Sequence, residues 1–193
     1  KAVMDSIAAA EKAGEKSLAI KTGADGKNAA STTVSIPKTS AQAIAEAALN
    51  LTVQTADGSR VTLAPATLTS LAGQAAGGTL ELTVTSETKQ AASKIIGGAD
   101  GLDGENIDLD NCLVVSVTVQ SNGSEIGSFA GNMTIDLPAG SAKYAVGQSY
   151  RVYQISAGGS VETISGTCVK ADGAAYIRVS VSRPATFVVT KDK

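Results

Sequence analysis

The sequence predicts an α+β fold that consists mostly of antiparallel β-strands. Hydrophobic residues make up 43% of the 193 residues but aromatic residues only 3%, so the core must be built from aliphatic side chains. Apolar and polar residues alternate over residues 80–85 and 113–119, a pattern typical of strands with one buried face. The 20 glycines, and dipeptides such as Asp57-Gly58 and Asn122-Gly123, indicate many turns between short strands.

The N-terminal region repeats a unit of strand, helix and strand. The fullest copy places these elements at residues 34–37, 41–48 and 51–55. A second copy places them at residues 60–63, 65–74 and 80–85, with Pro65 in the first turn of its helix. A fainter copy opens the chain with a helix over residues 2–13 and a strand over residues 18–22. Repetition of a small unit favours an architecture built by copying over one built around a catalytic cleft.

From residue 80 onward the sequence reads almost entirely as β-strands. The Asn122-Gly123 turn leads to strands at residues 126–129, 133–137, 150–155, 161–164, 168–170, 175–181 and 186–190. Short antiparallel strands at this spacing usually pack as a β-sandwich. We therefore expect a strand–helix–strand repeat subdomain over residues 1–86 and a β-sandwich-like subdomain over residues 87–193; one continuous domain is the alternative.

Composition and charge argue against several classes of function. The net charge of −2 contains no basic block, so we expect no nucleic-acid partner. No stretch approaches the roughly 20 apolar residues that span a bilayer, so we expect no membrane insertion. The chain has 0 histidines, which removes Ser-His-Asp and Cys-His nucleophiles, and we expect no enzyme. The first residue is not Met and no signal peptide is visible, so we expect a fragment excised from a longer protein.

Several segments resemble a module of bacterial cell-surface proteins. These segments are residues 51–72, the pair Gly77-Gly78, residues 115–138 and residues 153–189. In Gram-positive anaerobes the module often lies upstream of S-layer homology repeats. The resemblance implies an extracellular, non-catalytic segment of a wall-attached polypeptide, and it supplies no catalytic residues. The chain departs from the module in its acidic insertion at residues 100–110, and its closing segment lacks the module's His-Phe-Ser ending.

A cluster of carboxylates in a glycine-rich stretch is a candidate calcium site. Carboxylate oxygens on such a loop are the ligands that Ca²⁺ requires. No EF-hand spacing fits, so a solvated loop with Asp-Gly turns is the alternative. The candidate ligands are Asp100, Asp103, Glu105, Asp108 and Asp110. We expect no other cofactor.

The two cysteines, Cys112 and Cys168, each lie near a strand of the β-rich region. Outside the cell they could form an inter-sheet disulfide, which would stabilise the fold by about 2–4 kcal/mol. Two free thiols that pack as small hydrophobic side chains are the alternative.

Three tyrosines form a candidate ligand surface: Tyr144, Tyr150 and Tyr153. Tyrosine rings can line a sugar-binding face, although they also fill the edge of a sheet with the hydroxyl in water.

Together these observations favour a non-catalytic structural or adhesive module of a bacterial cell-surface protein, located at the cell wall. A carbohydrate-binding module on such a protein is the alternative. The partners expected for either reading are the cell wall, a host or partner protein, or a glycan.

Overall fold

The computed structural model describes residues 2–21, 31–102, 107–108, 112–139 and 144–190. The helices within these residues are α1 (Ala2–Ala13), α2 (Lys38–Glu46), α3 (Pro65–Gln74) and α4 (Lys89–Gly97). The strands are β1 (Ser17–Lys21), β2 (Ser31–Pro37), β3 (Asn50–Gln54), β4 (Arg60–Leu63), β5 (Thr79–Ser86), β6 (Leu113–Ser121), β7 (Ser124–Glu125), β8 (Met133–Ala139), β9 (Ser149–Ile155), β10 (Val161–Ala171), β11 (Ala174–Val181) and β12 (Thr186–Val189). The predicted β-rich α+β class is confirmed.

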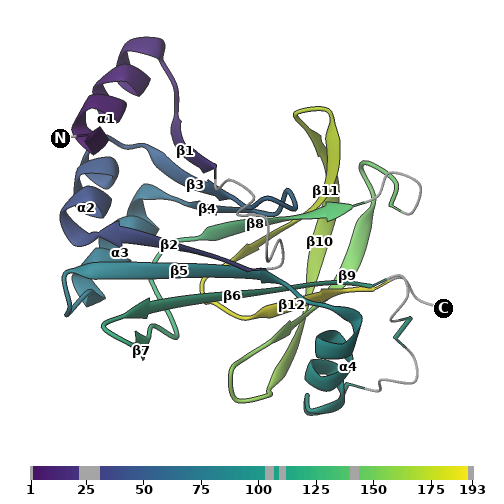
Figure 1. The fold of residues 1–193 in the computed structure, drawn as a ribbon. Coiled ribbons are helices and arrows are strands. Elements are labelled where there is room, and N and C mark those ends of the chain that lie inside the picture. Colours follow the sequence, from purple (N-terminus) through teal and green to yellow (C-terminus); the bar gives the residue numbers. More distant parts are fainter. Residues whose placement is uncertain (1, 22–30, 103–106, 109–111, 140–143, 191–193) are drawn as a thin grey trace.

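The strands form one continuous sheet in the order β1-β3-β4-β8-β11-β10-β9-β12-β6-β5-β2, with β7 paired to β6 beside this path. Within the described chain β1 and β3 are the one parallel pair, and the other pairs are antiparallel. The sheet curls, so that β2, β5, β6 and β12 form one half, β1, β3, β4 and β8 form the other, and β9–β11 form the bend (Figure 1). The predicted β-sandwich is not confirmed, because both halves belong to one continuous hydrogen-bonded sheet and not to two separate sheets.

The main core lies inside this curl. Alternate residues of each strand point inward, as the period of a β-strand requires. Leu82 on β5, Val117 on β6 and Phe187 on β12 meet Ile135 on β8 and Ile177 on β11 in one cluster, and none of the five is more than 1% exposed. Full burial of each such side chain stabilises the fold by roughly 1.5–3 kcal/mol.

The two full copies of the repeat carry the chain from one half of the curl to the other. One copy is β2–α2–β3 and the next is β4–α3–β5, so each helix follows a strand of one half and precedes a strand of the other. Helices α2 and α3 lie together at one end of the curl (Figure 1). Ile44 of α2, and Leu68 and Leu71 of α3, join the main core there.

Helix α4 covers part of the outer face of the sheet. Its buried residues Ala92 and Ile96 pack with Val114 of β6, Ile155 of β9 and Val188 of β12 in a second cluster. The expectation of almost pure β-structure after residue 80 is wrong at this helix. The overlooked signals are the Thr88 cap, whose side chain accepts a hydrogen bond from the backbone N–H of Ala91 at 3.2 Å, and the apolar residues spaced four apart.

The proposed boundary between residues 86 and 87 remains a prediction. Two antiparallel strand pairs, β4 with β8 and β5 with β6, cross it. Among the described helices, none has both the length and the apolar character needed to cross a membrane.

Candidate functional site

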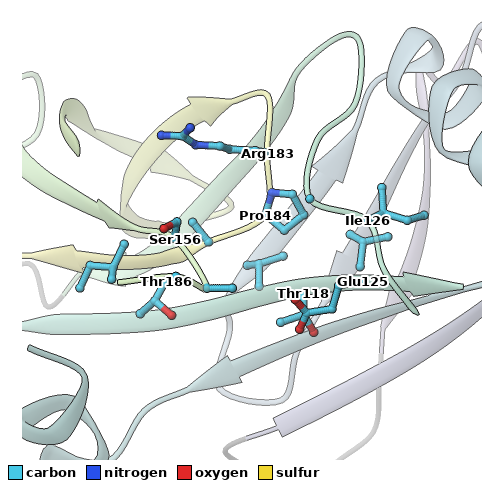
Figure 2. Close-up of a pocket in the computed structure, with 14 residues that line it drawn as sticks. Thr118, Glu125, Ile126, Ser156, Arg183, Pro184 and Thr186 are labelled. Atoms are coloured by element: carbon cyan, nitrogen blue, oxygen red, sulfur yellow. The ribbon is translucent and has the colours of Figure 1, made fainter. Parts of the chain in front are cut away.

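A hollow of about 330 Å³ lies beside β6, and we call it the β6 slot. Four segments line it: residues 117–119 of β6, residues 125–127 after β7, residues 155–158 in the β9–β10 hairpin, and residues 183–186 between β11 and β12. In Figure 2, Pro184 lies between Ser156 and Ile126, and Thr118 lies below them on β6. The volume falls at the lower end of the range for small-ligand sites.

The slot exists because β12 and β7 pair with the same edge of β6 and both end before they reach each other. Strand β12 begins at Thr186, and Pro184 before it has no N–H to give to a ladder. At the other end of the slot, on the same edge of β6, β7 ends at Glu125, so the strand predicted over residues 126–129 is wrong. Ile126 and Phe129 instead turn into the main core, where they are 6% and 8% exposed. Burial of these side chains directs the chain away from β6.

Hydrogen bonds bracket the open part of β6. The N–H of Val117 donates to the carbonyl of Ala185 at 3.0 Å, and the N–H of Ile126 donates to the carbonyl of Val119 at 2.8 Å. On its opposite side the same segment pairs normally with β5, where Thr118 faces Thr83. Residues 117–119 are therefore fully paired on the β5 side, and on the other side only the Val117 N–H and the Val119 carbonyl have backbone partners among the described residues.

The rim of the slot carries one carboxylate and one guanidinium. Glu125 is exposed at the end where β7 pairs with β6. Arg183 is half-buried and forms an ion pair with Glu162 of β10. The hydroxyl of Thr186 shares a 2.8 Å hydrogen bond with that of Ser116, so it is engaged within the sheet. Backbone polar groups, small apolar side chains and a single rim carboxylate are suited to recognising a ligand.

No protein-family model and no curated protein matches this chain. The resemblance to wall-attached modules therefore remains a likeness of sequence pattern. A curled β-sheet hosts many unrelated functions, so the fold alone assigns none.

The slot was not predicted from the sequence. The one feature of the sequence that indicates it is Pro184, which comes just before a strand and has no N–H to donate to a neighbouring strand. The convergence of residues 125–127 with residues 183–186 depends on pairing between distant segments. A single sequence carries no record of that pairing.

The predicted calcium ligands are described only in part. Asp103, Glu105 and Asp110 lie outside the described residues. Asp100 is exposed, and its N–H donates to the carbonyl of Gly159 at 3.0 Å, which ties the start of this stretch to the β9–β10 hairpin. The described residues contain no group of three or more candidate metal-binding side chains. Calcium binding stays a prediction.

Neither cysteine forms a disulfide in this structure. Cys168 is buried in the main core, its Sγ lies 3.7 Å from the carbonyl oxygen of Tyr144, and burial raises the pKa of its thiol. Cys112 is partly buried and packs against the second cluster, beneath α4. The two thiols thus belong to different clusters, and a disulfide between them stays a prediction.

The three candidate tyrosines do not share one surface. Tyr144 is 2% exposed, and its ring meets that of Tyr150 edge to face at 4.9 Å. Burial, with a contribution from the neighbouring Cys112, raises the pKa of Tyr144 to about 12. Tyr150 packs on the main core, whereas Tyr153 packs on the second cluster, because residues three apart on a strand point to opposite faces. Sugar binding by these rings stays a hypothesis.

Asp57 is the acidic residue whose surroundings most clearly perturb it among those described. Burial by itself would raise the pKa of Asp57, but hydrogen bonds from Ser86, Thr55 and Ser59 outweigh burial and hold the pKa below its ordinary value. Ser59 donates its backbone N–H at 3.3 Å and its hydroxyl at 3.0 Å. The hydroxyls of Thr55 and Ser86 also donate to the carboxylate. Because Ser86 ends β5, Asp57 fastens the β3–β4 turn to the other half of the curl.

Proposed function

We propose that this chain is a non-catalytic structural and adhesive module of a bacterial cell-surface protein, and that it carries tension along the polypeptide. The observation that supports this most directly is the position of β12. This last strand lies in the middle of the sheet, between β9 and β6. Helix α1 and the end of β12 lie at opposite ends of the molecule, as suits a module placed in line within a longer chain (Figure 1).

Tension applied at the C-terminal side would act on a strand that is anchored on both edges. Strand β12 pairs over four residues with β6 and over four with β9. Phe187 and Val189 are 0% exposed in the main core, and Val188 is 0% exposed in the second cluster. Pulling along the strand therefore has to shear two ladders together and expose side chains from both faces, a cooperative event.

Tension at the N-terminal side would meet a weaker structure. Strand β1 is the edge of the sheet, pairs in parallel with β3 over five residues, and leaves Ile20 37% exposed. Helix α1 contributes Ile7 and Ala10 to the core, which is little apolar burial for a 12-residue helix. We expect α1 and β1 to detach before the rest of the sheet.

Single-molecule force spectroscopy on a polyprotein that contains this module tests the proposal. Detachment of residues 2–30 should lengthen the chain by about 100 Å at low force, because an extended residue spans about 3.3–3.6 Å. Rupture of the remaining sheet should follow at distinctly higher force and release roughly 500 Å. The variant Phe187→Ala should lower the second force, while Met4→Ala, at a side chain that is 58% exposed, should leave it unchanged.

A single extension at low force, or a second force unaffected by Phe187→Ala, would contradict a mechanical role. Location is tested separately. Antibodies against the module should label intact cells of the source organism, and labelling only after permeabilisation would refute the cell-surface assignment.

A further inference from the structure

A second hollow, of about 360 Å³, is lined by residues of β9, β10 and β11 and by residues just before β8 and after β11, and we call it the Gln154 hollow. Arg183 borders both hollows, and in Figure 2 its guanidinium points away from Ile126 and Thr118 of the β6 slot. Six of the eight described residues that line the Gln154 hollow are polar or charged: Asn132, Gln154, Glu162, Ser180, Ser182 and Arg183.

Gln154 places a carboxamide without a protein partner in this hollow. The residue is 4% exposed, and within the described chain its side chain forms no hydrogen bond. It lies opposite Phe187 of β12 and Glu162 of β10, and it shares the inner face of the sheet with Val152, two residues before it. Buried polar groups in folded proteins are nearly always hydrogen-bonded, to protein, water or ligand. Whatever satisfies the Gln154 carboxamide therefore has to enter through the hollow that it lines.

The charges that line the hollow cancel, which favours a neutral ligand. Glu162 and Arg183 form an ion pair with each other, and both side chains remain about half exposed. An anion would have to displace Glu162 from Arg183, and a cation would have to displace Arg183 from Glu162. The other polar side chains of the lining are amides and hydroxyls, which carry no charge. A ligand rich in neutral hydrogen-bonding groups meets this lining without breaking the ion pair.

Two adjacent hydroxyls of a sugar ring match the free carboxamide. A carboxamide presents an N–H donor and a carbonyl acceptor side by side in one plane, and each hydroxyl both donates and accepts. One hydroxyl accepts from the Gln154 amide nitrogen while its neighbour on the ring donates to the Gln154 carbonyl oxygen. The two apolar lining residues, Ile164 and Val181, belong to or pack against the main core and offer a surface for the C–H face of the ring. The volume lies near the lower end of the range for small-ligand sites, as one ring requires.

We propose that the Gln154 hollow binds one neutral sugar ring, with two adjacent hydroxyls on the Gln154 carboxamide and a further hydroxyl beside the Glu162–Arg183 ion pair. No aromatic side chain is among the described residues that line the hollow, so the ring gains no stacking and binds weakly. The inference uses none of the tyrosines considered above. It is also independent of the mechanical role, because a chain that bears no tension could bind a sugar in the same way.

The test is an NMR titration of the ¹⁵N-labelled chain with the methyl α-pyranosides of glucose, galactose and mannose. With at least one of them we expect saturable shifts of the Gln154 side-chain amide, with a Kd on the order of 1–10 mM, and no shift of the exposed Gln148 side-chain amide. Tetrahydropyran-2-methanol, a ring with a single hydroxyl, should bind at least about ten-fold more weakly, because it loses hydrogen bonds to the carboxamide. Absence of Gln154 shifts with all three sugars, or equal binding of tetrahydropyran-2-methanol or sodium acetate, would overturn the proposal.

A matched pair of variants tests the role of the carboxamide. Gln154→Met keeps the length of the side chain but removes its polar atoms, so sugar binding, followed at the backbone amides of Glu162 and Arg183, should weaken at least about ten-fold. The Tm of Gln154→Met should be unchanged or higher, by up to about 8 °C, because a buried polar group without a partner is removed. Gln148→Met, at an exposed glutamine, should bind sugar and melt as the parent does. A lower Tm for Gln154→Met, or undiminished sugar binding, would overturn the proposal, and the titration of the parent chain tests it without any variant.

Discussion

Gly166 on β10 lies where the packing of the curled sheet leaves no room for an added methyl group. A Cβ built on Gly166 would lie 2.7 Å from Cγ2 of Ile177, 2.8 Å from Cγ2 of Val152 and 3.0 Å from Cγ1 of Val179. These three side chains come from the strands on either side of β10, and each is at most 1% exposed. All three are β-branched, so their χ1 angles cannot rotate away cheaply.

The magnitude for Gly166→Ala follows from two opposing effects. Overpacking a tight core site destabilises a protein by about 1–3 kcal/mol. Replacing Gly by Ala also restricts the unfolded chain, which offsets about 0.4–1 kcal/mol. We expect a net loss of about 1–2 kcal/mol in the free energy of unfolding, and a Tm lower by about 2–8 °C for a chain of this size.

Urea denaturation followed by circular dichroism measures this loss, and Gly73→Ala is the control. A Cβ at Gly73 meets nothing within 4 Å, so that helical position should be unchanged or more stable by up to about 1 kcal/mol. Val152→Ala removes both Cγ methyl groups of Val152, of which Cγ2 is the one that crowds Gly166. The double variant Gly166→Ala with Val152→Ala should therefore be more stable than the sum of the single changes predicts, by about 0.5–3 kcal/mol. A fully stable Gly166→Ala variant, or strict additivity in the cycle, would refute the close-packing argument.

Three further predictions test other parts of the chain. Asp57→Ala should lower the free energy of unfolding at neutral pH by about 0.5–1.5 kcal/mol, because Asp57 is exposed and water screens its hydrogen bonds, whereas Glu15→Ala should not change it. Because the folded-state pKa of Asp57 is lowered, this difference should be complete above the ordinary value of 3.8 and shrink as the pH falls through the lowered value. Thr88→Ala should destabilise α4 by about 0.5–2 kcal/mol and speed its amide exchange, whereas Thr88→Ser should preserve the cap. If the acidic stretch binds calcium, CaCl₂ should raise the Tm relative to EDTA, and Asp100→Asn combined with Asp108→Asn should abolish that rise.

Local structure was predictable where short-range chemistry decides it. The helix begun by Pro65 runs to Gln74 as predicted, and the Asn122-Gly123 turn forms with positive φ at both residues, 51° and 74°. Helix α4 escaped prediction because its buried face has just two residues, Ala92 and Ile96, whose spacing of four is a weak signal of a helix. Its chain segment also follows a strong strand, which favoured continued β-structure.

Long-range pairing was not predictable, and the candidate site depends on it. Nothing local indicates that β12 inserts between β9 and β6, or that β1 pairs in parallel with β3. Tyr144 shows the consequence for a site residue. An aromatic ring with a hydroxyl suits a ligand surface, yet Tyr144 lies inside the core. Its ring contacts that of Tyr150, and its carbonyl oxygen accepts a hydrogen bond from Cys168. Burial of a given side chain is decided by which strands become neighbours, and that information lies outside its own segment.

The same topology explains why the slot lies on β6 and not on another strand. β6 has nine residues, of which four face β12 and two face β7 on one edge, so three remain between these partners. Neither partner can extend to fill the gap: Pro184 ends one ladder, and burial of Ile126 turns the other chain inward. The burial of Ile126 in the main core and the missing N–H of Pro184 set these two boundaries, so the opening follows from how the neighbouring segments pack and not from the sequence of β6 itself.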